Sequence, residues 1–213
     1  MVQTCFDKVD AVLCLGAHSD DIEIGCGATI RKLTRLRPGL AVYWVVFTAD
    51  GRRQAEARKS ARVFLRDAGK SQIIIKQFRN GFFPFEGAAI KDFFESLKAR
   101  VNPGLVFTHF RHDRHQDHRL ISDLTWNTFR DHLIFEYEIP KYDGDMGSPN
   151  FFMPIDERLA VEKADDLCRF FSTQNNKHWF DQETFLALMH LRGIECCSKY
   201  AEAFYIRKMV CGS

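Results

Sequence analysis

The chain has 213 residues, of which 46% are hydrophobic and 27% are charged, close to the averages of globular proteins. This composition excludes a disordered or fibrous chain, and the length is typical of one compact domain. The 30 Lys and Arg residues nearly balance the 28 Asp and Glu residues, which leaves a formal net charge of +2. Because a nucleic-acid-binding domain usually carries a strong positive charge, we expect no nucleic-acid partner.

The first ten residues, MVQTCFDKVD, lack the basic start and apolar run of a signal peptide. No later segment approaches the roughly 18 uncharged apolar residues that indicate a membrane helix. We therefore expect a cytoplasmic protein without a membrane span. The seven cysteines are an odd number, which favours reduced thiols over a disulfide framework.

Short apolar runs alternate with helix-forming segments along the first half of the chain. The predicted elements are, in chain order, a strand at 11–16, a helix at 24–37, a strand at 41–48, a helix at 53–68, a strand at 72–77, a helix at 88–101 and a strand at 105–108. This alternation is typical of βαβ units, so we predict an α/β fold with a mostly parallel sheet and helices on both faces.

The pattern is less regular in the second half. We predict a strand at 132–139, a turn-rich segment at 141–150, helices at 156–171 and 181–195, and a last strand at 201–207. Neither an internal repeat nor a linker-like segment interrupts the chain, so residues 1–213 are expected to form a single domain.

Two groups of polar residues follow predicted strands. His18, Asp20, Asp21 and Glu23 come directly after the first strand. After the strand at 105–108, four of the eight histidines occur at intervals of three residues: His109, His112, His115 and His118. Ligands of parallel sheets bind at the carboxyl ends of the strands, so the two groups can meet although ~90 residues separate them.

A metal ion would account for both groups, because imidazole nitrogens and carboxylate oxygens are zinc ligands and a catalytic zinc keeps three protein ligands plus water. Asp20 and Asp21 are adjacent and cannot easily direct both carboxylates to one point, so one would bind the metal while the other faces its water. Zinc lowers the pKa of such a water to about 7, and a carboxylate can take its proton. Asp117 is expected to orient His115 and keep it protonated.

The two groups resemble the signatures of the PIG-L/LmbE family of zinc-dependent de-N-acetylases. The family's His-Pro-Asp-Asp-Glu corresponds to residues 18–23, HSDDIE, and its later His-Pro-Asp-His to residues 115–118, HQDH. The resemblance implies a Rossmann-like three-layer sandwich with one Zn²⁺ per chain, held by His18, Asp21 and His118.

The resemblance also implies roles for residues beside the metal. Asp20 would be the general base, and His115 would stabilise the oxyanion and protonate the leaving amine while Asp117 orients it. Residues 53–56, RQAE, resemble the family's Arg-x-x-Glu, which implies that Arg53 contacts the substrate sugar.

The chain departs from the family pattern at several positions. Ser19 and Gln116 replace prolines, and Ile22 displaces the usual glutamate by one position to Glu23, whose role stays open. Asn80 occupies a region where some members have a substrate-binding aspartate.

Some conspicuous residues have a simpler structural interpretation. For His109 and His112 a hydrogen bond to the backbone is favoured over a role in the site. The small residues at 25–29, GCGAT, lack the spacing of a nucleotide-binding loop, which favours close helix packing.

The resulting hypothesis is a metal-dependent amidase that acts on carbon–nitrogen bonds in linear amides. It would remove the N-acetyl group from an amino sugar or sugar conjugate, a small-molecule partner, and release acetate and a free amine. Iron or cobalt could occupy the same ligands. The alternatives are a metal-dependent phosphoesterase with two metal ions and a noncatalytic nucleotide- or metal-binding module. The sequence leaves formation of a homo-oligomer open.

Overall fold

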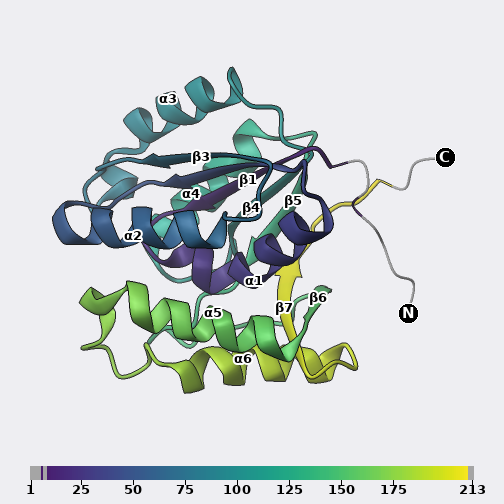
Figure 1. Cartoon of the computed structure of the whole chain (residues 1–213). Coiled ribbons are helices and arrows are strands. Elements are labelled where there is room, and N and C mark those ends of the chain that lie inside the picture. The colour runs from purple at the N-terminus through teal and green to yellow at the C-terminus, as the bar shows by residue number, and fades with distance from the viewer. Residues whose placement is uncertain (1–5, 7–8, 211–213) are drawn as a thin grey trace.

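The computed structural model describes residue 6 and residues 9–210. In this part of the chain, helices surround one mixed sheet of seven strands (Figure 1). The elements are, in chain order, β1 (Ala11–Gly16), α1 (Asp21–Leu36), β2 (Ala41–Val46), α2 (Gly51–Phe64), β3 (Lys70–Ile75), η1 (Phe83–Phe85), α3 (Gly87–Lys98), β4 (Leu105–His109), α4 (Gln116–Thr128), β5 (Leu133–Tyr137), β6 (Phe151–Ile155), α5 (Glu157–Phe170), η2 (Ser172–Gln174), α6 (Gln182–Glu195) and β7 (Tyr200–Tyr205).

The strand order is β3-β2-β1-β4-β5-β7-β6. The strands from β3 to β5 run parallel, whereas β7 is antiparallel to both β5 and β6. The predicted α/β fold with a mostly parallel sheet is therefore confirmed. Chain order reverses between β1 and β4, and open α/β sheets bind their ligands in the crevice at the carboxyl ends of such a strand pair.

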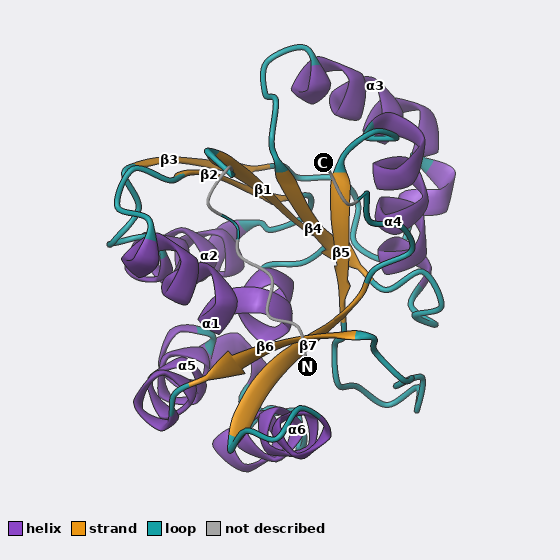
Figure 2. Cartoon of the chain, turned by 90° about the vertical axis from the view of Figure 1, so that its right-hand side faces the viewer, coloured by secondary structure: helices purple, strands orange, loops and turns teal. Residues whose placement is uncertain are grey.

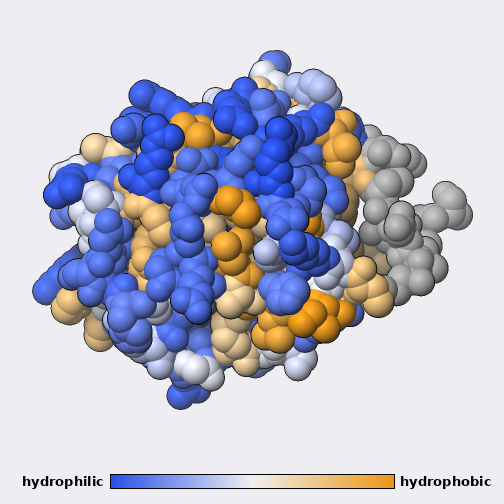
Figure 3. Space-filling model, turned by 60° about the horizontal axis from the view of Figure 1, so that its bottom comes forward, coloured by the Kyte–Doolittle hydropathy of each residue, from blue (hydrophilic) through white to orange (hydrophobic). Residues whose placement is uncertain are grey.

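Helices cover both faces of the sheet. Figure 2 shows α1 and α2 on one face and α3 and α4 on the other, with α5 and α6 beside the β6–β7 ribbon. Helix α5 packs against α1 and α2 and so adds a further layer outside them. Figure 3 brings forward the side of the molecule on which α5 and α6 lie in Figure 1. Hydrophilic residues cover most of this face, with smaller hydrophobic patches between them.

The expected elements are present, but one α-helix and one strand were not predicted, nor were the two short 3-10 helices η1 and η2. Helix α4 begins after His115, whose side chain accepts a hydrogen bond from the Asp117 N–H as an N-cap. Histidine is not among the usual N-cap residues, so the sequence lacks the normal helix-start signal. Strand β6 contains Pro154 and lies at the edge of the sheet, where a strand tolerates proline.

Other sequence expectations concern the termini and the cysteines. Residues 1–5 and 7–8, on which the expected lack of a signal peptide depends, lie outside the described residues. In the described part of the chain, no helix combines the length and the apolar character needed to cross a bilayer. The five cysteines found there are all free thiols.

The small residues of α1 allow close packing, as predicted. A Cβ atom on Gly25 would lie 2.1 Å from the ring of Tyr137, and one on Gly27 would lie 2.5 Å from the ring of Phe64. Since real Cβ atoms do not approach other heavy atoms so closely, glycine at these positions lets α1 lie directly against β5 and α2.

A buried ion pair contacts the backbone in the middle of α1. Lys163 Nζ on α5 and Glu202 Oε1 on β7 are 2.6 Å apart, and each side chain is 3% exposed. Lys163 donates to the carbonyl of Ile24 at 2.6 Å, and Glu202 accepts the N–H groups of Ala28 and Thr29 at 2.9 and 2.7 Å. The Ile24 carbonyl and the Ala28 N–H are hydrogen-bond partners in a regular helix, so the ion pair contacts both groups of one backbone pair of α1. The ion pair therefore joins α1 to the C-terminal part of the chain.

We predict that Glu202→Ala lowers the free energy of unfolding by about 3–5 kcal/mol, because it leaves the Lys163 ammonium buried without its counter-charge. Urea unfolding monitored by circular dichroism measures this loss. Glu157→Ala is the matched control, since Glu157 pairs with Lys199 at an exposed position and its removal should cost much less. Equal losses in the two variants would contradict this role for the ion pair.

Candidate metal centre and active site

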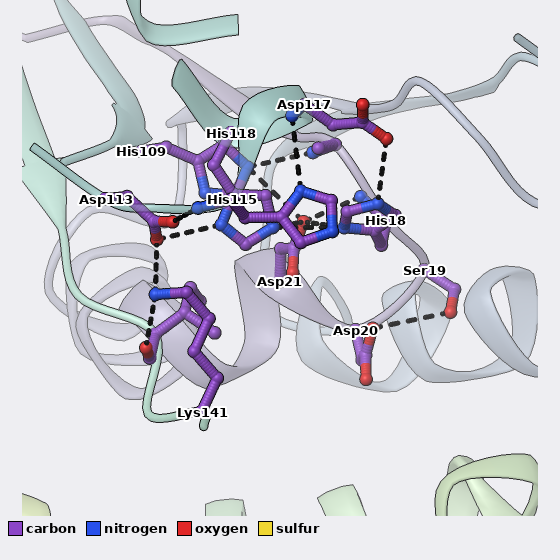
Figure 4. A network of polar contacts seen from close by, with 12 residues as sticks. His18, Ser19, Asp20, Asp21, His109, Asp113, His115, Asp117, His118 and Lys141 are labelled. Atoms are coloured by element: carbon purple, nitrogen blue, oxygen red, sulfur yellow. Dashed lines mark hydrogen bonds and ion pairs between the residues drawn. The ribbon is translucent and has the colours of Figure 1, made fainter. Parts of the chain in front are cut away.

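The two polar groups of the sequence meet at the crevice between β1 and β4. The loop after β1 carries His18 and Asp20 and leads into α1, which begins with Asp21, while the loop after β4 carries His115 and leads into α4, whose first turn carries His118. Figure 4 shows the histidine rings gathered together, with Asp113 and Lys141 to one side and Asp20 and Ser19 to the other. The pairing of β1 with β4 thus brings together residues that are about a hundred positions apart.

Three potential ligand atoms form a compact triangle. His18 Nδ1 lies 3.0 Å from His118 Nε2, and Asp21 Oδ2 lies 3.3 Å from the first atom and 3.5 Å from the second. Two ligand atoms that are each about 2.0–2.1 Å from a tetrahedral zinc ion lie about 3.3–3.4 Å apart. The triangle therefore has nearly the dimensions of one face of a zinc coordination sphere.

Each of the two imidazoles has a carboxylate next to the ring nitrogen that does not belong to the triangle. Asp117 Oδ2 lies 3.3 Å from Nε2 of His18, and Asp113 Oδ2 lies 2.8 Å from Nδ1 of His118. If each imidazole donates to its carboxylate, the nitrogen that faces the triangle keeps a free lone pair. Metal-binding histidines typically have such a partner, so the donor set fits a cation. Asp113 was not singled out from the sequence, although it lies within the second polar group.

The pKa values of the three triangle residues are shifted in different directions. Burial would raise the pKa of Asp21, but the facing His118 and His18 hold it well below its ordinary value. Burial and the neighbouring His109 lower the pKa of His118 to about 3. Burial also opposes charge on His18, yet the carboxylates of Asp21 and Asp117 raise its pKa to about 9. The same carboxylates would attract a metal cation.

His109 makes a hydrogen bond to the backbone of the kind expected from the sequence. It ends β4, is fully buried, and its Nε2 accepts the backbone N–H of Ala17 at 2.9 Å. Its ring stacks on that of His118 with 3.9 Å between the centroids. His109 also approaches Asp21 and His118 closely enough for a ligand triad, but its Nε2 lone pair is already used by Ala17. His112 is exposed and lines none of the cavities described.

Asp20 lies beside the ligand triangle in a cavity of about 210 Å³. Its side chain is nearly buried, and burial together with the charge of Asp21 raises its pKa. Arg53, from the first turn of α2, lies 3.7 Å from Asp20 Oδ1 and donates to Ser19 Oγ at 3.1 Å. Arg53 and Asn80 both line this cavity, so both can reach a bound ligand.

The expected pairing of the Asp117 carboxylate with His115 is not found. That carboxylate accepts the backbone N–H groups of Gly81 and Phe83 at 2.7 and 3.1 Å and contacts His18. It is the backbone N–H of Asp117 that donates to Nδ1 of His115, at 3.2 Å. Burial and the charge of His18 lower the pKa of His115, while the charge of Asp117 opposes this shift. The sequence could not reveal the contacts of Asp117 because residues 81–83 approach from another loop.

Glu23 lies away from the cavity. It is fully buried, and its burial raises its pKa to about 8. Because it does not line the site, its displacement from the family position leaves the ligand triangle intact.

The model of the GlcNAc-PI de-N-acetylase family, PIG-L, matches residues 13–129. The chain belongs to this family, as its two signatures indicated. The matched region contains the ligand triangle, Asp20, Arg53 and His115.

Two relatives with deacetylase in their names are similar to the chain. An uncharacterized deacetylase of Escherichia coli K12, YaiS, is 31% identical over 124 residues, which are 53% of this chain. The match spans 64% of that relative, less than two thirds of its length. The N,N'-diacetylchitobiose deacetylase of Pyrococcus horikoshii has 23% identity, with 94% of this chain and 85% of that chain covered and a TM-score of 0.74.

The same fold also serves another reaction. The 4-carboxy-2-hydroxymuconate hydratase GalB of Pseudomonas putida KT2440 has 15% identity, with 96% of this chain and 98% of that chain covered and a TM-score of 0.67. Likeness at such identities shows the fold alone, so the reaction must be argued from the side chains.

We predict that Asp113→Asn weakens binding of a divalent metal ion by about 10–100-fold, because the amide no longer supports His118 as the carboxylate does. Competition with a chromogenic chelator measures the affinity. Asp123→Asn changes an exposed carboxylate on the same helix, α4, and should leave it unchanged. Wild-type affinity in Asp113→Asn would show that the carboxylate is dispensable.

Proposed function

We propose that the chain is a zinc-dependent hydrolase that removes the N-acetyl group from an amino sugar or sugar conjugate, releasing acetate and a free amine. The family membership and the deacetylase names of two relatives support this reaction. The observation that carries it is the triangle of His18, Asp21 and His118 at the wall of a cavity that Asp20 and His115 also line.

His18, Asp21 and His118 would hold one zinc ion. Two imidazoles and one carboxylate leave a coordination position open, as catalytic zinc sites require. Zinc would supply Lewis-acid activation of water and of the acyl carbonyl. The engagement of His109 with Ala17 supports one ion rather than two, and therefore favours amide hydrolysis over two-metal phosphoester chemistry.

Asp20 would act as the general base. Its raised pKa keeps it a stronger base than an exposed aspartate, and Arg53 beside it favours the ionised form that accepts a proton. Asp20 is the N-cap residue of α1, so the helix backbone fixes its place next to Asp21.

His115 would stabilise the tetrahedral oxyanion. Since its Nδ1 accepts the N–H of Asp117, the neutral ring carries its proton on Nε2 and can donate it toward the cavity. The same Nε2–H would give its proton to the departing amine, and the nitrogen freed in this way would regain a proton from Asp20, which holds the one taken from water. Arg53, which lines the same cavity, would contact the substrate sugar.

The residues that line the cavity range from His18 to Trp179 and include several that follow residue 129. We therefore propose that the chain works as a single domain in which the segment after residue 129 completes the substrate pocket. The substrate would be a small N-acetylated molecule.

We predict that Asp20→Asn retains about one zinc per chain but loses at least about 100-fold in kcat, because the amide cannot take a proton. His118→Ala should lose the metal and the activity together. Elemental analysis of purified protein and acetate release from a panel of N-acetyl sugars measure the two effects.

His112→Ala is the matched control for these variants, since it removes an exposed histidine of the same loop and should retain both zinc and activity. Full activity in Asp20→Asn would overturn the assignment of the base. Two metal ions per chain together with phosphoester cleavage would replace the deacetylase proposal by the phosphoesterase alternative.

A further inference from the structure

Several residues from outside the family-matched region line the active-site cavity, and three of them form one group. Tyr142 lies in the loop after β5, and Lys177 and Trp179 lie between η2 and α6. The proposed reaction gives none of them a role, although they line the same cavity as His18 and Asp20.

Tyr142 and Trp179 form an aromatic corner. Their ring centroids are 6.3 Å apart and the ring planes meet at 87°. Tyr142 is 67% exposed, and Trp179 is half-buried. Aromatic faces left open at the mouth of a polar cavity provide apolar surface that a ligand with a flat apolar face can cover.

Lys177 provides a hydrogen-bond donor at this corner. Its ammonium lies 5.3 Å from the centroid of the Trp179 ring and makes no ion pair or side-chain hydrogen bond with any residue that the structure describes. By contrast, Lys141 in the same cavity is engaged by Asp113 at 3.0 Å and by Asp145 at 2.5 Å. Lys177 is therefore the lysine of this cavity that remains available for a ligand oxygen.

The corner is anchored to the helix that carries Arg53. Glu56, one turn further along α2, accepts hydrogen bonds from the Ser172 hydroxyl at 2.7 Å and from the backbone N–H and hydroxyl of Thr173 at 3.1 and 2.6 Å. Beyond the corner, Phe180 is buried and Asp181 caps α6 by accepting the Thr184 N–H. Both ends of the segment that bears Lys177 and Trp179 are thus fixed.

We propose that Tyr142, Lys177 and Trp179 form a subsite for a second sugar ring, so that the preferred substrate is an N-acetylated disaccharide or longer glycan rather than a monosaccharide. The inference rests on the proposed function, which places the acetamide of the first ring at the ligand triangle. The second ring packs its apolar face on Trp179, its edge meets Tyr142, and its hydroxyl oxygens accept hydrogen bonds from Lys177. The exposure of Tyr142 supports this arrangement, because a ligand must reach the mouth of the cavity to cover that ring.

Steady-state acetate release from N,N'-diacetylchitobiose and from N-acetylglucosamine tests the subsite. We expect the wild type to prefer the disaccharide by at least about tenfold in kcat/KM, equivalent to ~1.4 kcal/mol. Trp179→Ala should lower kcat/KM for the disaccharide, mainly through a higher KM, at least about fivefold more than it lowers kcat/KM for the monosaccharide. Trp179→Phe should restore much of the preference, since phenylalanine also offers an aromatic face.

Equal losses on both substrates in Trp179→Ala, or equal use of both by the wild type, would overturn the subsite while leaving deacetylation established. Calorimetric binding of N,N'-diacetylchitobiose to the zinc-loaded protein separates the two proposals further. Binding that Trp179→Ala weakens about tenfold, without acetate release by the wild type, would support the subsite and contradict the proposed function. Absence of both binding and turnover would contradict both.

Discussion

The parallel pairing of β1 with β4 is the constraint on which the site depends. Val12, Leu13 and Cys14 lie opposite Leu105, Val106 and Phe107, and all six are fully buried, so the register of the two strands is fixed by the core. The connections after the two strands then leave toward opposite faces of the sheet, one into α1 and the other into α4. Each helix starts with acidic or imidazole side chains directed into the space between them.

The polar cluster is stable in an apolar surrounding because its members bond to one another. His109 ties the end of β4 to the backbone of Ala17, and Asp113 and Asp117 each hold one of the imidazoles that face Asp21. Asp117 also fixes residues 81–83 through their backbone N–H groups, which links the loop after β3 to the cluster. These bonds favour one arrangement of the cluster, whereas an isolated buried charge would be costly.

Much of this architecture could be predicted from local sequence patterns. The alternation of apolar runs and helix-forming segments predicted the parallel core, and the position of the polar groups after strands predicted where a site would form. Contacts between distant segments could not be predicted in this way. The carboxylate of Asp117 turned out to bond to Gly81, Phe83 and His18 rather than to its near neighbour His115, and the support of His118 by Asp113 depends on side-chain directions at the start of α4. Likewise, the irregular hydrophobic pattern after residue 132 did not indicate that residues such as Tyr142 and Trp179 line the cavity.

The buried ion pair of Lys163 and Glu202 restricts the substitutions that this chain tolerates. The ammonium donates to a buried carbonyl of α1, the carboxylate accepts two N–H groups of the same helix, and burial makes either charge costly without the other. A single replacement at either position is therefore strongly destabilising, whereas a paired replacement by residues that still satisfy the α1 backbone is less costly. Since the two residues come from α5 and β7, an exchange of C-terminal segments between related chains would succeed only when both elements are transferred together. The helix that begins with Asp21 is thus dependent on a region that lies entirely beyond its own family signature.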